Sequence, residues 1–302
     1  MRHSFLTTDV FTDRRFGGNP LAVFPNASGI PEEALQRIAM EFNLSETTFV
    51  YPPSDARHTR RVRIFTPVDE LPFAGHPTVG TAYALAVAGE IPLRGTETRV
   101  IFEEGVGPVP VLIRSENGRP TFCQLTAARL PETGPPPPDS ALLAEVLSLR
   151  PEDLADETNS PQAFSCGLPF LFVPLRNRDA VRRARVRLDV WERVLGAYWA
   201  RDIMVFSRDP EGADAHVRAR VFGPTVNITE DPATGSACAA LGGYLAAREP
   251  ATGGAFRYVI EQGFEMGRPS IVELEVDTSG GKVAAVRVGG SAVMVMQGTI
   301  EI

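Results

Sequence analysis

Two stretches of the chain begin a helix in the same way: FAGHPTVG at residues 73–80 and DPATGSAC at residues 231–238. In each, a glycine (Gly75 or Gly235) and one small polar or imidazole residue precede a run of small residues. A helix that begins on glycine presents bare backbone N–H groups and the positive end of its dipole to whatever lies in front. Two such helix starts facing one cleft would hold a small carboxylate and stabilise the charge formed when it loses a proton.

The two helix starts belong to a longer repeat. RIFTP at residues 63–67 lies 157 positions before RVFGP at residues 220–224, and the two helix-opening glycines are 160 positions apart. GNPLAV at residues 18–23 has a weaker counterpart in GLPFLF at residues 167–172. Taken alone, Arg-aliphatic-Phe-x-Pro is an ordinary strand end, but similar offsets in the same order favour a duplication. A period near half the chain indicates two copies of one domain rather than a solenoid.

The length of 302 residues also agrees with about two domains. Four consecutive prolines within residues 131–138 predict an extended linker between an N-terminal domain at 1–130 and a C-terminal domain at 139–291. We leave open whether the closing strand, 292–302, returns to the first domain. Each half is rich in expected strands and has one long helix that begins on glycine. We therefore predict an α+β fold of two pseudo-symmetric domains, each a sheet wrapped around a central helix.

Composition limits the partners and cofactors that we expect. The net charge of −7 argues against nucleic acid or an anionic membrane as a partner. No apolar run approaches a bilayer span, and the N-terminus lacks the apolar stretch of a signal peptide, so we expect a cytoplasmic protein. Cys123, Cys166 and Cys238 are too widely spaced for a disulfide framework, and none of the four histidines has a zinc-site spacing. We therefore expect no metal.

Motifs of other enzyme classes are weak or absent in the sequence. GVG at residues 105–107 is followed by Pro108 where a dinucleotide-binding helix should open, so we interpret it as a turn between strands. The chain has neither a Walker A sequence nor a Gly-x-Ser-x-Gly elbow. The basic run RRARVR at residues 182–187 is typical of a solvated face.

Four residues beside the repeated motifs could carry chemistry, and each also has a structural interpretation. Glu46 begins an apolar strand; partial burial at a cleft would raise its pKa toward the operating pH, but a solvated loop would leave it ordinary. His76 precedes a proline at a helix start and is alternatively a histidine packed at a domain boundary. Asp231 is alternatively a helix N-cap, and Ser236 a second capping hydroxyl. His76 and Ser236 occupy matching places in the repeat, which strengthens the functional interpretation.

Six motifs, in this order along nearly the full chain, resemble those of the PhzF-like family of phenazine biosynthesis. They are GNPLAV (18–23), LSET (44–47), PFAGHPT (72–78), EDPATGSA (230–237), QG (262–263) and GRPS (267–270). That family shares the diaminopimelate epimerase fold, so the resemblance implies this fold for both domains. It also implies a homodimer.

The resemblance implies an activity and a role for each candidate residue. The family's phenazine enzyme isomerises trans-2,3-dihydro-3-hydroxyanthranilate without a cofactor. Its acid/base glutamate falls on Glu46, and its supporting histidine and aspartate fall on His76 and Asp231. The serine and glycine that contact the substrate carboxylate fall on Ser236 and Gly235, and the first helix start adds Gly75 as the other half of the anion site. We predict a cofactor-free isomerase acting on a small carboxylic acid, with a cyclic one favoured.

Two alternatives stay open, an amino-acid epimerase or racemase and a non-catalytic protein that binds small carboxylates. Inversion of a stereocentre needs two bases on opposite faces of the carbon, and the related epimerases use one cysteine from each half. Here those places fall near Ala74 and Pro232, which are neither bases nor nucleophiles. Cys238 lies about one helical turn further on, and we interpret it as a packed core thiol. A single carboxylate suits proton transfer on one face, which favours an isomerase.

Overall fold

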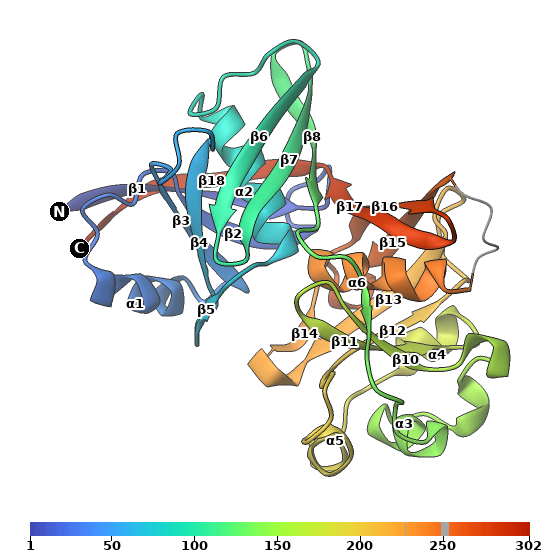
Figure 1. Ribbon diagram of the computed structural model, residues 1–302. Coiled ribbons are helices and arrows are strands. Elements are labelled where there is room, and N and C mark those ends of the chain that lie inside the picture. The colour runs from blue at the N-terminus through green and yellow to red at the C-terminus, as the bar shows by residue number, and fades with distance from the viewer. Residues whose placement is uncertain (227, 249–253) are drawn as a thin grey trace. The chain divides into compact units, whose positions relative to one another are not determined.

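The computed structural model describes residues 1–226, 228–248 and 254–302. The chain divides into two compact units (Figure 1). The first unit combines Met1–Ala128 with Arg287–Ile302, and the second is Arg129–Val286. Each unit is a sheet with one long, buried helix against it.

The first unit is built on a mixed sheet that covers the helix α2. Its elements are β1 (Arg2–Val10), β2 (Asn19–Phe24), α1 (Glu32–Phe42), β3 (Glu46–Tyr51), β4 (Arg60–Phe65), β5 (Glu70–Leu71), α2 (Gly75–Val87), β6 (Glu97–Glu104), β7 (Gly107–Glu116), β8 (Arg119–Thr126), the end of β17 (Lys282–Gly290) and β18 (Ala292–Glu301). The strands pair in the order β17-β8-β7-β6-β4-β3-β2-β1-β18. Only β2–β3 and β4–β6 are parallel among these pairs, and β5 adds to β4.

The second unit repeats this plan with extra helices. Its elements are β9 (Glu132–Thr133), α3 (Ser140–Val146), η1 (Pro151–Asp153), η2 (Glu157–Asn159), β10 (Gln162–Ser165), β11 (Pro169–Pro174), α4 (Arg178–Arg183), α5 (Leu188–Leu195), β12 (Asp202–Ser207), β13 (Val217–Gly223), η3 (Pro224–Val226), β14 (Ile228–Asp231), α6 (Gly235–Ala246), β15 (Gly254–Gln262), η4 (Phe264–Met266), β16 (Ser270–Ser279) and the start of β17. The parallel pairs are β11–β12 and β13–β15, and β14 adds to β13. These match β2–β3, β4–β6 and β5 of the first unit.

The central helices α2 and α6 are made of small and apolar residues on all sides, which is the pattern of a helix that is buried all round. Every residue of α6 from Gly235 to Leu245 is buried. In α2, a side chain at Gly80 would place its Cβ 2.5 Å from Val10 Cγ2, so the strands can approach only a glycine. The predicted α+β fold, a sheet around a central helix in each half, is confirmed.

The two segments at the predicted domain boundaries pair with strands. Residues 131–138, predicted as a linker, lie inside the second unit, where Glu132–Thr133 pairs with β10. The closing strand β18 runs antiparallel to β1 along its length, from Arg2 opposite Glu301 to Val10 opposite Ala292. Backbone pairing therefore assigns β18, and residues 132–133 of the expected linker, to a sheet.

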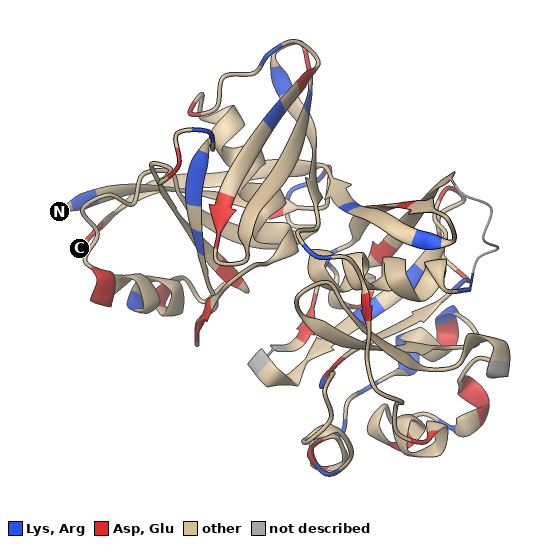
Figure 2. Cartoon of the chain, in the orientation of Figure 1, with Lys and Arg blue, Asp and Glu red and all other residues tan. Residues whose placement is uncertain are grey.

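Charged residues of both signs are interspersed in the two units (Figure 2). The chain has 30 Lys and Arg residues against 37 Asp and Glu residues, which gives the net negative charge. Over the described ranges, every helix is too short or too polar to cross a bilayer.

The repeated Arg-x-Phe-x-Pro motif makes the same contacts in both units. Nε and Nη2 of Arg63 donate to the carboxylate of Glu70, each at 2.7 Å. Nε and Nη2 of Arg220 donate to the carboxylate of Glu230 at 2.7 and 2.8 Å. Each guanidinium also lies over the phenylalanine two residues further on, at 5.1 and 4.9 Å from the ring centre. The motif thus joins a strand to the short strand that leads into the central helix.

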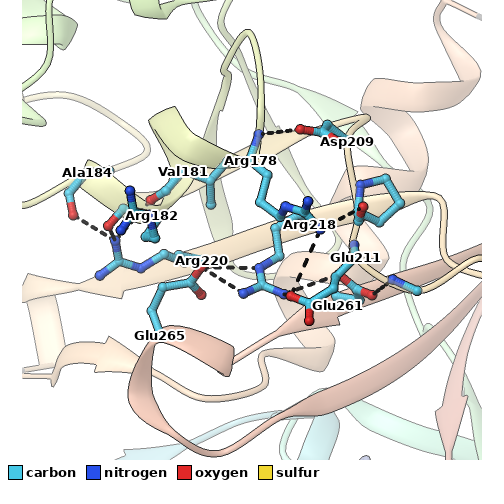
Figure 3. Close-up of polar contacts among 12 residues, drawn as sticks. Arg178, Val181, Arg182, Ala184, Asp209, Glu211, Arg218, Arg220, Glu261 and Glu265 are labelled. Atoms are coloured by element: carbon cyan, nitrogen blue, oxygen red, sulfur yellow. Dashed lines mark hydrogen bonds and ion pairs between the residues drawn. The ribbon is translucent and has the colours of Figure 1, made fainter.

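The two arginines differ in burial. Arg220 is 2% exposed, and its Nη1 also donates to the carbonyl groups of Val181, Arg182 and Ala184 at the end of α4 (Figure 3). The Arg63 side chain is 15% exposed, and its partners face solvent more. An arginine that satisfies buried acceptors is harder to remove than one whose partners water can solvate.

Replacing Arg220 by alanine should lower the free energy of unfolding by about 3–5 kcal/mol, because Glu230 and three carbonyl groups would lose a buried donor. The matched variant Arg63→Ala should cost only about 1 kcal/mol, since water can solvate its partners. Urea denaturation of both variants measures the difference. Equal losses would show that burial does not separate the two pairs.

Candidate active site

Glu46 and His76 are in contact in the first unit. Glu46 is the first residue of β3, and His76 is the second residue of α2. Oε2 of Glu46 lies 3.3 Å from Nε2 of His76, and the two side chains are 12% and 4% exposed. Residues 30 positions apart in the sequence therefore form one carboxylate–imidazole pair.

Asn19, the first residue of β2, orients the imidazole of His76. It is fully buried, and its Nδ2 lies 3.1 Å from His76 Nδ1. Because an amide nitrogen donates, Nδ1 is the acceptor, and the proton of the neutral ring lies on Nε2, which faces Glu46. The GNPLAV motif contains Asn19, but nothing local in the sequence indicates this role.

Burial keeps His76 neutral. Loss of hydration lowers the pKa of His76 to about 3, outweighing the opposing effect of a hydrogen bond with the Pro20 backbone. At neutral pH the ring is therefore uncharged, and its Nε2 lies 3.3 Å from Glu46 Oε2 without the geometry of a hydrogen bond. A neutral donor can orient a carboxylate without the strong loss of basicity that a nearby cation would cause.

The start of α2 leaves backbone donors in front of the helix. The first helical hydrogen bond runs from the N–H of Thr78 to the carbonyl group of Ala74. The N–H groups of Gly75 and His76 come before it, and Pro77 has none. Both donors belong to buried residues, in line with the helix start predicted from Gly75.

Asp231 ends β14 in the second unit, and it is not the helix N-cap considered in the sequence. Thr234 has that position, with no side-chain capping hydrogen bond, and Thr234 Oγ1 donates to Asp231 Oδ2 at 2.5 Å. Gln262, fully buried at the end of β15, donates from Nε2 to the carbonyl group of Asp231 at 2.8 Å and to Thr234 Oγ1 at 3.0 Å. Its Oε1 accepts from the backbone N–H of Thr234 at 3.1 Å. The β15 strand end thereby positions the segment before α6.

Gly235 and Ser236 begin α6 and are buried. The first helical hydrogen bond runs from the N–H of Cys238 to the carbonyl group of Thr234, so the N–H groups of Gly235 and Ser236 precede it. Ser236 therefore offers backbone as well as hydroxyl hydrogen bonding at this helix start. The thiol of Cys238 is fully buried, and burial raises its pKa, which is the packed core thiol that we predicted.

The structure thus groups the predicted residues into two sets. Gly75 and His76 lie with Glu46 in the first unit, and Asp231 lies near Gly235 and Ser236 at the start of α6 in the second. Within the parts of the chain that the structure describes, no three His, Cys, Asp or Glu side chains are grouped as metal ligands.

His76 should remain neutral to well below pH 6.5, with its proton on Nε2. In ¹⁵N NMR of the imidazole nitrogens, its signals should stay constant between about pH 8 and pH 5, and His76→Gln identifies them by their loss. The unfolded chain binds this proton near pH 6.5 and the folded chain only near pH 3, so His76 destabilises the fold increasingly as pH falls through that window. The glutamine variant should therefore lose less stability on acidification. A ring that titrates near 6.5 would refute its desolvation.

Comparisons with known proteins identify the family of the chain. The model of the family described as phenazine biosynthesis-like protein matches residues 8–298. An uncharacterized isomerase of Mesorhizobium japonicum is 40% identical over 99% of both chains, and the trans-2,3-dihydro-3-hydroxyanthranilate isomerase of Pseudomonas fluorescens is 33% identical over 99% of both. A crystal structure of the PhzF-family phenazine biosynthesis protein of Bacillus anthracis, 27% identical, superposes with a TM-score of 0.88 over 100% of both chains. The predicted isomerase class is confirmed, and the chain belongs to the phenazine biosynthesis-like protein family.

Proposed function

We propose that the protein moves a proton within a small carboxylic acid and that Glu46 carries the proton. The observation that supports this most is the contact between the Glu46 carboxylate and the buried, neutral His76. Because the Pseudomonas fluorescens relative is named as the isomerase of trans-2,3-dihydro-3-hydroxyanthranilate, this compound is the leading substrate candidate. An unidentified analogue is the next.

In the proposed reaction, the Glu46 carboxylate removes a proton from a substrate carbon while the C–H electron pair moves into the adjacent unsaturated system. The resulting carboxylic acid returns the proton to another carbon on the same face, and the double bond moves with it. His76 Nε2–H orients the carboxylate during both steps. General acid–base catalysis of this kind contributes about 10²–10⁴ in rate.

The two helix starts supply the proposed anion site. Backbone N–H groups at Gly75, Gly235 and Ser236 would bind the substrate carboxylate and offset the charge that develops when carbon loses its proton. Asp231, fixed by Thr234 and Gln262, would hold a polar group of the substrate. The reaction as proposed uses no cofactor.

Incubation with trans-2,3-dihydro-3-hydroxyanthranilate in deuterated water, without added metal or nucleotide, tests the reaction by NMR. We expect conversion with deuterium at one carbon of the product. The variant Glu46→Gln should bind the compound but turn it over about 10²–10⁴ times more slowly, because an amide cannot accept the proton.

The matched control is Glu41→Gln, the same change on an exposed position of α1, which should leave turnover unchanged. Near-normal turnover by Glu46→Gln would remove Glu46 from the mechanism. Tight binding without exchange of any C–H proton would favour a carboxylate-binding protein. A need for added metal or nucleotide would reject the reaction as written.

The homodimer and the cytoplasmic location expected from the sequence are also proposals. Light scattering at micromolar concentration should report twice the chain mass of 32.7 kDa. A monomer under these conditions would reject the dimer, and cell fractionation addresses the location.

A further inference from the structure

Glu104 is a buried carboxyl group that the proposed proton transfer does not use. It is the last residue of β6 and is 8% exposed. Its Oε1 lies 2.7 Å from Oγ1 of Thr78, and the same Oγ1 lies 2.7 Å from the carbonyl oxygen of Ala74. A threonine hydroxyl has one proton, so it can donate to only one of these two oxygens. The other contact needs a proton from elsewhere.

The geometry of the first turn of α2 assigns the Thr78 proton to Ala74. The backbone N–H of Thr78 reaches the Ala74 carbonyl group only at 3.4 Å, a long hydrogen bond, whereas the hydroxyl reaches it at 2.7 Å. With that proton on Ala74, Glu104 must donate to Thr78 Oγ1, which only a protonated carboxyl group can do.

The second oxygen of Glu104 leads to the same protonation state. Among the described residues, Oε2 of Glu104 is buried without a hydrogen-bond partner. An ionised carboxylate with one bare oxygen in a core is strongly disfavoured. Burial accordingly raises the pKa of Glu104 to about 8, and a hydrogen bond with Thr78 opposes this shift only when Thr78 is the donor.

The second unit has a permanently neutral group at the matching place. In the parallel pair β4–β6, Glu103 is opposite Arg61. In the matching pair β13–β15, Glu261 is opposite Arg218. Glu103 accepts two backbone N–H groups at 2.8 and 2.7 Å, and Glu261 accepts two at 2.8 and 2.6 Å. The next residues, Glu104 and Gln262, therefore correspond, and each is followed by a glycine that approaches a proline before the central helix.

Gln262 shows what this place requires. Its amide nitrogen donates to Thr234 Oγ1 and to the carbonyl group of Asp231, directly before α6. In the second unit the strand end thus provides a neutral donor to the segment that begins the buried helix. A protonated Glu104 provides the same function to Thr78 in the first turn of α2.

We propose that Glu104 is a neutral carboxylic acid that donates to Thr78 and thereby acts as a positioning residue for the start of α2. If Glu104 loses its proton, the Thr78 hydroxyl must turn to the new carboxylate, and the carbonyl group of Ala74 loses its short donor. Ala74 directly precedes Gly75 and His76, so deprotonation would disturb the helix start. The consequence for turnover rests on the proposed function, whereas the consequence for stability does not.

The charged groups on neighbouring elements do not offset the negative charge that Glu104 would carry without this proton. Glu103, adjacent on β6, faces away from the core and binds the backbone of Ser54 and Asp55 and the imidazole of His58. Arg61 of β4 pairs with Glu103 and so lies on that other face. On α2, the titratable neighbour His76 is neutral, and Gly107 of β7 is opposite Glu104 itself.

The melting temperature as a function of pH, for the wild type and Glu104→Gln, tests the proposal. The folded wild type holds the Glu104 proton up to about pH 8 and the unfolded chain only to about 4.5, so wild-type stability should fall as pH rises through this window. The glutamine variant has no such proton. Its melting temperature relative to wild type should rise by about 5–10 °C between pH 4.5 and pH 8.

The matched control is Glu103→Gln, the same change one residue away. Hydrogen bonds from the backbone of Ser54 and Asp55 lower the pKa of Glu103 to about 2, so its charge is constant across this pH window. Nδ1 of His58 also lies 2.8 Å from Oε1 of Glu103, and imidazoles change charge between pH 5 and pH 8, so this comparison is made in a His58→Gln background. There the offset of Glu103→Gln should not change between about pH 5 and pH 8. A constant offset for Glu104→Gln as well would overturn the proposal.

A measurement on the wild type alone covers the case that Glu104→Gln does not fold. With glutamate labelled with ¹³C at the carboxyl carbon, one NMR signal should report a protonated carboxyl at pH 7 and titrate near pH 8. Full ionisation of every glutamate at pH 7 would refute a neutral Glu104. If a substrate is known, kcat should fall above pH 8 in the wild type but not in Glu104→Gln. Absence of turnover in both would count against the proposed function and leave the stability and NMR results to decide on Glu104.

Discussion

Each unit depends on a helix that starts inside the protein. The first turn of a helix has N–H groups without helical partners, and the segment before it has carbonyl groups that water cannot reach when it is buried. In the first unit Thr78 and Glu104 satisfy this segment, and in the second Thr234 and Gln262 do. In each unit, the end of the strand that comes after the central helix in the sequence therefore supports the start of that helix.

The same constraint explains the electrostatics around Glu46. Burial removes the charge from His76, as it does from Glu104, so neutral hydrogen-bonding groups surround the start of α2. A cation in place of His76 would hold a carboxylate in an ion pair and make it a weaker base. Here a neutral imidazole, in contact with Asn19, lies 3.3 Å from the carboxylate instead.

The duplication keeps geometry and changes chemistry. Arg63 and Arg220 join corresponding strands in the two units, but only Arg220 is buried among carbonyl groups. Glu104 and Gln262 hold matching positions, one as a titratable acid and the other as an amide. Two copies of one fold can thus diverge in charge while the hydrogen-bond direction at each helix start is maintained.

The sequence by itself predicted the fold class and the repeat, because glycine-led helix starts and repeated motifs are local patterns. The grouping of Glu46 with His76 was implied only by the family resemblance. It did not predict the hydrogen-bond partners. Asn19 is 57 residues from the His76 that it orients, and the alternative of Asp231 as an N-cap was wrong because Thr234 has that position.

Tertiary structure also decided which strands the ends of the predicted domains join and which carboxyl group keeps its proton. The segment 131–138 has the local pattern of a proline linker, yet it lies within the second unit, and its residues 132–133 pair with β10. Glu103 and Glu104 are identical neighbours in the sequence. One is an anion bound by backbone N–H groups and the other a buried acid, because strand alternation turns their side chains to opposite faces of the sheet.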